Sequence, residues 1–251
     1  MEQDKRYRIG KVFISVTDMN STICRIHELV RSKTKGLICV SNMRTTCYAN
    51  KHADYRMLME KALMCLPDGT PLVWMARLWG LKMVQRTAGP DVFLKMLQDK
   101  SIKHFLLGDT DATCQAIMQK YSDANIVGYY APPFGDVQDF NYQEIAKPIN
   151  DCEADIVWIS LRAPKQDFFA ERLLPLLNQQ LCIGVGAAFR FALGELRHPN
   201  KWVRRLGLTG FLWRKNKVKV FFATIRRTFI LLGWSIDILW SKIIRKERYA
   251  E

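Results

Sequence analysis

Short apolar runs alternate along the chain with stretches in which apolar residues recur at helical spacing. The runs predict strands at 11–16, 36–42, 62–66, 104–108, 125–130, 155–161 and 181–189. The stretches predict helices at 19–32, 55–62, 70–80, 89–101, 112–122, 142–150 and 166–180. This alternation is typical of right-handed βαβ units, so it predicts an α/β fold with a Rossmann-like, mainly parallel sheet flanked by helices.

The pattern changes after Gly194, where the chain becomes basic, aromatic and continuously helical. Residues 229–240 are nearly all apolar but contain Asp237, and Lys and Arg flank them on both sides. Such a segment is too short and too interrupted to span a bilayer but suits its interface. The alternative is a helix packed on the α/β body. We therefore expect an α/β core over 1–195 and a basic, amphipathic, membrane-associating appendage over 196–251.

The charge of the chain follows the same division. The 251 residues contain 38 Lys and Arg against 24 Asp and Glu, a formal net charge of +14. From Glu195 onward there are fourteen Lys and Arg against four acids. This excess indicates a local contact with an anionic partner, such as an acidic membrane face. Nucleic acid is disfavoured, because the aromatic residues there cluster with aliphatic ones.

Several classes of protein lack support in the sequence. The seven cysteines form no CxxC pair, and the four histidines have no metal-ligand spacing, so we expect no metal site and no disulfide scaffold. The dinucleotide fingerprint, the Walker lysine and the GxSxG elbow are missing. No secretory signal or membrane span is predicted. A transfer reaction without metal or cofactor stays open.

Small polar residues gather where the predicted strands end. Because open parallel sheets bind ligands at the carboxyl ends of their strands, these residues predict a substrate crevice. Asp68 lies in LPDGT, where Asp-Gly suits a tight turn and would also present the carboxylate at this edge. The other candidates from strand ends are Ser41, Asn42, Gly69, Thr70, Gly108, Lys165, Gln166, Gly184 and Gly186. The two last glycines would let a ligand approach the backbone closely.

These motifs stand in the order found in the WecG/TagA/CpsF glycosyltransferases, which the chain resembles from about Lys11 to Gly207. The matching stretches are VSN, YRMLMEKALMCLPDGTPLVWMARLWG, QRTAGPDVF, FLLGD, RAPKQD, IGVGAAF and RHPNKWVRRLGL. PDGTPLVW and AGPD together are specific to the family. GVG and FLLG alone would not be.

The resemblance implies an inverting, metal-independent and cofactor-free transfer of a sugar from a UDP-sugar to a polyprenyl-diphosphate-linked saccharide. It implies Asp68 as the general base, with Ser41 and Gln166 lining the active site. Gly89 and Asp91 open the predicted helix 89–101, and Arg86 stands just before it, so that Arg86 and the amides near Gly89 could bind a phosphate. The family's appendage is thought to supply arginines that steady the leaving diphosphate; the candidates here are Arg204, Arg205, Arg214, Arg226 and Arg227.

The resemblance also implies a setting for the reaction. We expect a hexosyltransferase of envelope or exopolysaccharide synthesis, peripheral on the cytoplasmic face of the bacterial plasma membrane, with self-association left open. The donor would be of the N-acetylmannosamine type.

The chain departs from the family pattern at the crevice. Arg162 replaces a glycine, Asp167 a glutamate, and Arg190 an acid expected at a strand end. The extra arginines favour a more acidic sugar, such as a uronic acid, or else a catalytically degenerate scaffold subunit of a polysaccharide assembly complex.

Overall fold

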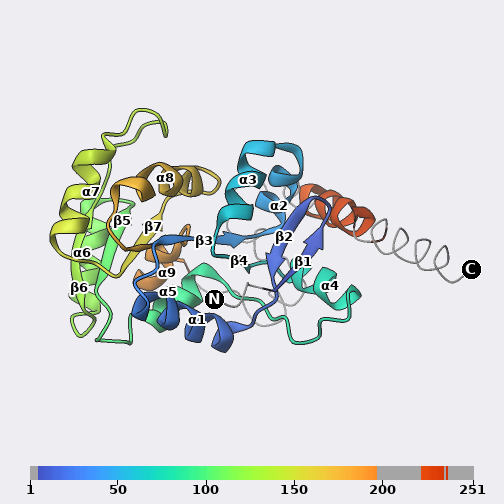
Figure 1. Ribbon diagram of the computed structural model, residues 1–251, viewed down its shortest axis with the longest axis horizontal. Coiled ribbons are helices and arrows are strands. Elements are labelled where there is room, and N and C mark those ends of the chain that lie inside the picture. The colour runs from blue at the N-terminus through green and yellow to red at the C-terminus, as the bar shows by residue number, and fades with distance from the viewer. Residues whose placement is uncertain (1–4, 197–221, 235, 237–251) are drawn as a thin grey trace, which may run out of the picture.

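The computed structural model describes residues 5–196, 222–234 and 236, and its centre is a six-stranded parallel sheet (Figure 1). The strand order is β4-β3-β8-β7-β5-β6, and every neighbouring pair is parallel. The α/β fold predicted from the alternating pattern is thus confirmed. The strands are β3 (Gly36–Ser41), β4 (Met64–Pro67), β5 (His104–Gly108), β6 (Ile126–Tyr130), β7 (Ile156–Ser160) and β8 (Leu181–Gly184).

Helices cover both faces of the sheet. They are α1 (Met19–Arg31), α2 (Met43–Lys51), α3 (Ala53–Lys61), α4 (Thr70–Leu78), α5 (Gly89–Met96), α6 (Asp111–Lys120), α7 (Tyr142–Asp151), α8 (Lys165–Leu173) and α9 (Ala188–Leu193), with a 3-10 turn at Leu174–Leu176. In Figure 1, α3 and α8 lie above the sheet and α1 and α5 below it. Asp18 caps α1 as predicted, since its carboxylate accepts a hydrogen bond from the backbone N–H of Ser21.

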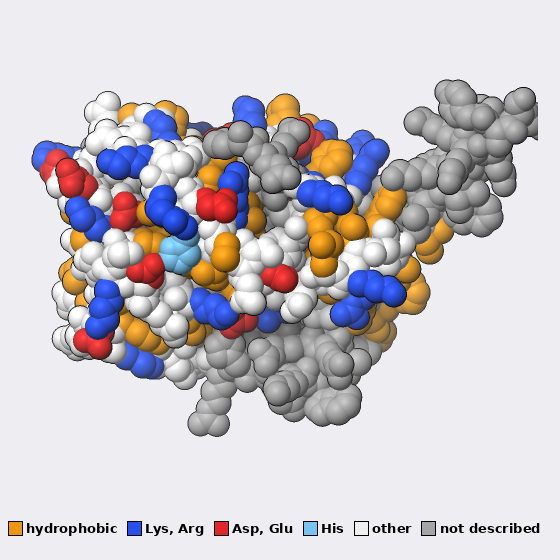
Figure 2. Space-filling view, turned by 60° about the horizontal axis from the view of Figure 1, so that its bottom comes forward, with side chains coloured by type: hydrophobic (Ala, Val, Ile, Leu, Met, Phe, Trp, Pro, Cys, Tyr) orange, Lys and Arg blue, Asp and Glu red, His pale blue; other side chains and the backbone are white. Residues whose placement is uncertain are grey.

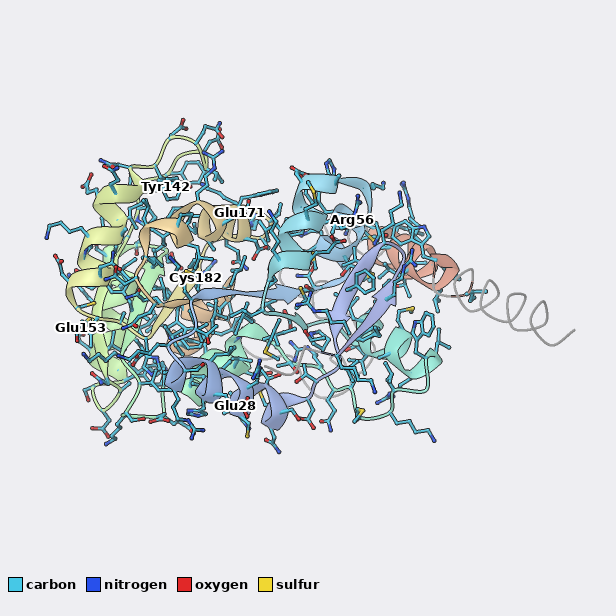
Figure 3. The ribbon with its side chains drawn as sticks, in the orientation of Figure 1. Glu28, Arg56, Tyr142, Glu153, Glu171 and Cys182 are labelled. Atoms are coloured by element: carbon cyan, nitrogen blue, oxygen red, sulfur yellow. The ribbon has the colours of Figure 1, made fainter. Side chains whose placement is uncertain are left out.

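Alternation along the buried strands divides the apolar side chains into two cores. On β3, Cys39 faces the core beneath α2, α3, α7 and α8, while Ile38 and Val40 face the core beneath α1, α5, α6 and α9. Cys182 of β8 belongs to the first core and stands in the middle of the sheet in Figure 3. A parallel sheet buried on both faces needs such continuous apolar strands.

The N-terminal strand does not join the main sheet. Residues 11–16 were expected as its first strand, but β2 (Val12–Ser15) pairs antiparallel with β1 (Arg6–Ile9) in a separate hairpin. β1 was not predicted, although Tyr7 and Ile9 are buried and alternate with the exposed Arg8, because the run is only four residues long and stands among charged residues. The hairpin lies beside α3 and the edge strand β4.

One helix was missed and one strand was predicted too long. Helix α2 was not predicted, because its composition is polar and its start depends on a capping box in which Asn42 and Thr45 exchange hydrogen bonds. The predicted strand 181–189 ends at Gly184, because Gly186 takes a left-handed conformation (φ 61°) and α9 begins at Ala188.

The predicted interfacial segment 229–240 falls only partly within the described residues. Residues 222–234 and 236 are helical. Leu231 is buried against the first core, and the Thr228 hydroxyl donates to Met43 Sδ at 3.3 Å. One side of this helix therefore packs on the α/β body. None of the helices in the described part of the chain has the length and hydropathy needed to cross a bilayer.

Candidate active site

The carboxyl ends of the strands bring the candidate residues to one edge of the sheet. Ser41 ends β3 and pairs in register with Pro67, and its carbonyl accepts the backbone N–H of Asp68 at 2.8 Å. Gly108 ends β5 and pairs with Ser160 of β7. Residues separated by more than a hundred positions thus share one edge because parallel strands all point the same way.

Asp68 forms the centre of an ion cluster at this edge. Arg86 donates from Nη2 to Asp68 Oδ1 at 3.0 Å and from Nε to the Asp68 carbonyl at 3.3 Å. The other guanidinium nitrogen lies 3.5 Å from Asp91 Oδ2, at the start of α5. The Asp68 side chain remains 22% exposed.

The surroundings of Asp68 bring its pKa toward neutrality. Burial raises the pKa of Asp68 to about 6, the Arg86 charge and hydrogen bond oppose the rise, and the Asp91 charge adds to it. A carboxylate with this pKa is ionised at pH 7 and yet basic enough to accept a proton during a reaction. The cluster therefore has the properties of a general base held by an arginine.

The polar residues beside Asp68 begin helices. Asn42 is the N-cap of α2, and its Oδ1 accepts the backbone N–H of Arg44 at 3.0 Å and of Thr45 at 3.2 Å. Gly69 is the N-cap of α4, which Thr70 opens. The helix start at Asn42 thus occupies its side-chain oxygen, whereas Ser41 Oγ is buried with no hydrogen-bond partner among the described residues.

Gln166 approaches the end of β8 from the first turn of α8. Its Oε1 accepts the backbone N–H of Gly186 at 2.9 Å. A Cβ built on Gly184 would lie 2.6 Å from Gln166 Nε2 and 2.9 Å from Asp167 Oδ1. The close approach expected at Gly184 therefore occurs, but the approaching groups are side chains of the protein itself.

Two other glycines expected at the substrate pack against backbone. A Cβ on Gly89 would lie 3.0 Å from the Val185 carbonyl oxygen, and one on Gly108 would lie 2.9 Å from that of Ser160. Their missing side chains let α5 approach the turn after β8 and let β5 approach β7. Both glycines lie at the edge where the strands end, and the contacts that they make are with backbone.

Lys165 is engaged by the proline-rich loop that follows β6. Its ammonium donates to the carbonyl of Gly135 and lies 5.4 Å from the ring of Phe134 and 5.1 Å from that of Phe140. The Phe134 side chain is fully exposed. These contacts fasten the loop over the start of α8.

The two unusual arginines occupy different places. Arg162 is exposed in the turn before α8, close to the crevice. Arg190 was expected at a strand end, but it lies inside α9 and forms an ion pair with Glu195 at 3.0 Å. The early end of β8 explains this correction. Arg204, Arg205 and Arg214 lie outside the described residues.

Sequence reasoning missed two groups near this edge. Arg44, in the first turn of α2, donates to the carbonyl of Ala163 and so joins α2 to the turn before α8. Tyr55 of α3 donates to the buried Asp167. Arg44 stands outside the quoted motifs, and Tyr55 opens one of them without a spacing that would connect it to Asp167, so only the fold shows these contacts. The described part of the chain contains no group of three or more His, Cys, Asp or Glu side chains that could hold a metal ion.

Comparison with known proteins gives one consistent answer. The sequence profile described as the Glycosyl transferase WecG/TagA/CpsF family matches residues 7–216. An N-acetylglucosaminyldiphosphoundecaprenol N-acetyl-beta-D-mannosaminyltransferase of Bacillus subtilis (strain 168) is 29% identical over 189 residues, which cover 72% of either chain.

Proteins of the same name lie further away. The one from Bacillus spizizenii is 25% identical over 79% of this chain and 82% of its own. That of Staphylococcus aureus (strain MRSA252) is 22% identical over 83% of this chain and 85% of its own.

Proposed function

Because the chain belongs to the WecG/TagA/CpsF family of glycosyl transferases, we propose that it transfers a sugar from a UDP-sugar to a polyprenyl-diphosphate-linked saccharide. The names of its relatives, which state an N-acetylmannosaminyl transfer to N-acetylglucosaminyldiphosphoundecaprenol, support this acceptor class. The observation that carries the proposal is the Asp68 carboxylate, partly exposed at the substrate edge with a pKa of about 6.

In the proposed reaction, Asp68 removes the proton from the acceptor hydroxyl as its oxygen attacks the anomeric carbon of the donor. The new glycosidic C–O bond forms while the bond from the anomeric carbon to the diphosphate oxygen breaks. UDP leaves with that electron pair, and the anomeric configuration is inverted. The proton stays on Asp68 until solvent takes it. Such general base catalysis typically contributes about 10²–10⁴-fold in rate.

The leaving diphosphate gains negative charge, which fixed cations can offset without a divalent metal. Arg86, at the same edge of the sheet, presents several N–H donors and is one candidate for this role. Arg204, Arg214 or another arginine of the appendage would complete the charge balance. Ser41 and Gln166, which are 1% and 2% exposed, would act from beneath the bound sugar or acceptor. Asn42, Gly69, Thr70 and the 184–186 turn lie at the same edge of the sheet and would contact the substrate.

The donor we favour is a UDP-linked N-acetylmannosamine, in line with the names of the relatives. A uronic acid donor is the second candidate, supported by the exposed Arg162 before α8. The product would be a lipid-linked precursor of an envelope polysaccharide or exopolysaccharide.

The outward side of the C-terminal helix supports a place on the inner face of the plasma membrane. Phe222, Ile225, Phe229 and Ile236 are 64%, 36%, 69% and 44% exposed. Figure 2 shows apolar side chains gathered on this part of the molecule between Lys and Arg. Apolar side chains flanked by cations suit a headgroup boundary. We propose residues 1–195 as the catalytic core and 196–251 as the membrane-contacting appendage.

The test is UDP release and product formation with a panel of UDP-sugars and a polyprenyl-diphosphate-linked N-acetylglucosamine acceptor, with and without EDTA. Wild-type protein should release UDP from one donor. Asp68→Asn should lose about 10²–10⁴-fold in rate. Asp123→Asn, which alters an acid that is 90% exposed in the turn between α6 and β6, serves as the matched control. If no donor supports transfer, the scaffold alternative replaces the enzyme.

A further inference from the structure

A buried hydrogen bond connects α3 with the substrate edge. The hydroxyl of Tyr55, which is 1% exposed, donates to Asp167 Oδ2 at 2.6 Å, and Asp167 itself has no exposed surface. A carboxyl group in such a place is costly unless hydrogen bonds hold it. Neither residue reaches the crevice, so the proposed chemistry leaves this pair without a role.

Gln166 connects the pair to the edge. Its side chain is 2% exposed, and its Nε2 and Asp167 Oδ1 lie 2.6 Å and 2.9 Å from the same point, the position of a Cβ on Gly184. Asp167 Oδ1 has no hydrogen-bond partner among the described residues. A Gln amide presents an acceptor on one side and two donors on the other. The NH₂ side of Gln166 thus lies toward the unpartnered Asp167 oxygen, which favours a donor there over the amide oxygen, and Oε1 accepts the Gly186 N–H at 2.9 Å.

The turn after β8 depends on this arrangement. Gln166 holds the N–H of Gly186, while the Ser160 hydroxyl donates to the Gly186 carbonyl at 2.6 Å. Gly184, just before the turn, leaves no room for a Cβ between itself and the Gln166 amide. If the amide rotated or withdrew, the turn would lose one of its two side-chain hydrogen bonds.

We propose that Tyr55 and Asp167 are positioning residues for glycosyl transfer, which fix the orientation of the Gln166 amide and thereby hold the Gly184–Gly186 turn at the substrate edge. This inference rests on the proposed function. The pair acts through Gln166 and does not touch substrate. A displacement of the reacting groups by about 1 Å can cost on the order of 10²-fold in rate. The buried hydrogen bond between Tyr55 and Asp167 can therefore affect the rate without touching the substrate.

The test is a set of paired kinetic measurements. Tyr55→Phe removes only the hydroxyl, and we expect it to lower kcat about tenfold while the KM for the donor changes less than about twofold. The same substitution in a Gln166→Ala background should have no further effect, because the group that it positions is gone. Asp167→Asn keeps an oxygen that can accept from Gln166 and should retain more activity than Asp167→Leu.

Tyr121→Phe is the matched control, since that hydroxyl also donates to the protein, to the Ala192 carbonyl at 3.0 Å, but in another part of the fold. It should lower stability slightly and leave kcat unchanged. Three results would overturn the inference: equal losses from Tyr55→Phe in both backgrounds, an unchanged kcat for folded Tyr55→Phe, or full activity of Gln166→Ala. If wild-type protein itself transfers no sugar, the proposed function falls, and this inference with it.

Discussion

Replacement of Arg86 by Met tests whether this arginine tunes the proposed base. Arg86 Nη2 lies 3.0 Å from Asp68 Oδ1, and the Asp68 and Arg86 side chains are 22% and 24% exposed. Burial raises the pKa of Asp68 to about 6 even though the Arg86 charge opposes the rise. Removal of that charge leaves burial and the nearby Asp91, both of which act in the upward direction.

The size of the effect follows from the distance. At an effective dielectric constant of about 40–80 for a partly exposed pair, two charges about 3 Å apart attract each other by about 1.4–2.8 kcal/mol. This energy corresponds to about 1–2 pKa units. The pKa of Asp68 should therefore rise to about 7–8 in Arg86→Met. The ionised fraction at pH 7 would fall from about nine-tenths to between one-half and one-tenth.

The assay is the pH dependence of kcat/KM between pH 5 and 9, with Arg25→Met of the exposed Arg25–Glu28 pair as the control. In wild type the rate should rise with pH up to about 6, because the base must lose its proton. In Arg86→Met the pH at which kcat/KM rises should shift upward by about 1–2 pH units. Weaker phosphate binding would lower kcat/KM equally at every pH and would not change this shift. If kcat/KM still rises at the wild-type pH and only its maximum is reduced, the reasoning is refuted.

Three further predictions concern the turn, the buried acid and the C-terminal helix. Gly184→Ala should displace Gln166, because Gln166 Nε2 would lie 2.6 Å from the new Cβ and the overpacking strain would be about 1–3 kcal/mol. We expect kcat to fall at least tenfold, and wild-type kinetics in this variant would contradict the close contact between Gly184 and Gln166. The folded-state pKa of Asp167, about 7, lies above its ordinary value of 3.8, so its contribution to stability is present at low pH and is lost as pH rises from about 4 to 7. The free energy of unfolding in urea should fall between pH 5 and pH 7.5, and it should fall less in Asp167→Asn than in wild type. An equal fall in both proteins would assign the pH dependence to other groups. Phe222→Ser with Phe229→Ser should weaken flotation with anionic vesicles without lowering Tm, whereas Leu231→Ala, at a fully buried position, should cost about 2–4 kcal/mol in unfolding free energy; unchanged vesicle binding by the double variant would refute the membrane contact.

Much of the fold could be read from local pattern, because burial imposes it. The strands β3, β5 and β7 are buried on both faces and therefore appear as continuous apolar runs. The hairpin and α2 could not be read in this way. β1 alternates arginines with Tyr7 and Ile9 but is only four residues long, and α2 has a polar composition, so neither gives a strong local signal.

The sequence by itself determined the α/β class, the position of Asp68 after a strand and the family resemblance, because each depends on local order along the chain. Only the tertiary structure decided which groups meet Asp68 and Gln166. Arg86 reaches Asp68 from 18 residues away, and Tyr55 reaches Asp167 from 112. Such contacts depend on strand order and helix packing, which bring together residues that no spacing rule connects. For the same reason, the left-handed Gly186 and its hydrogen bond to Gln166, which end β8 early, became visible only in the folded chain.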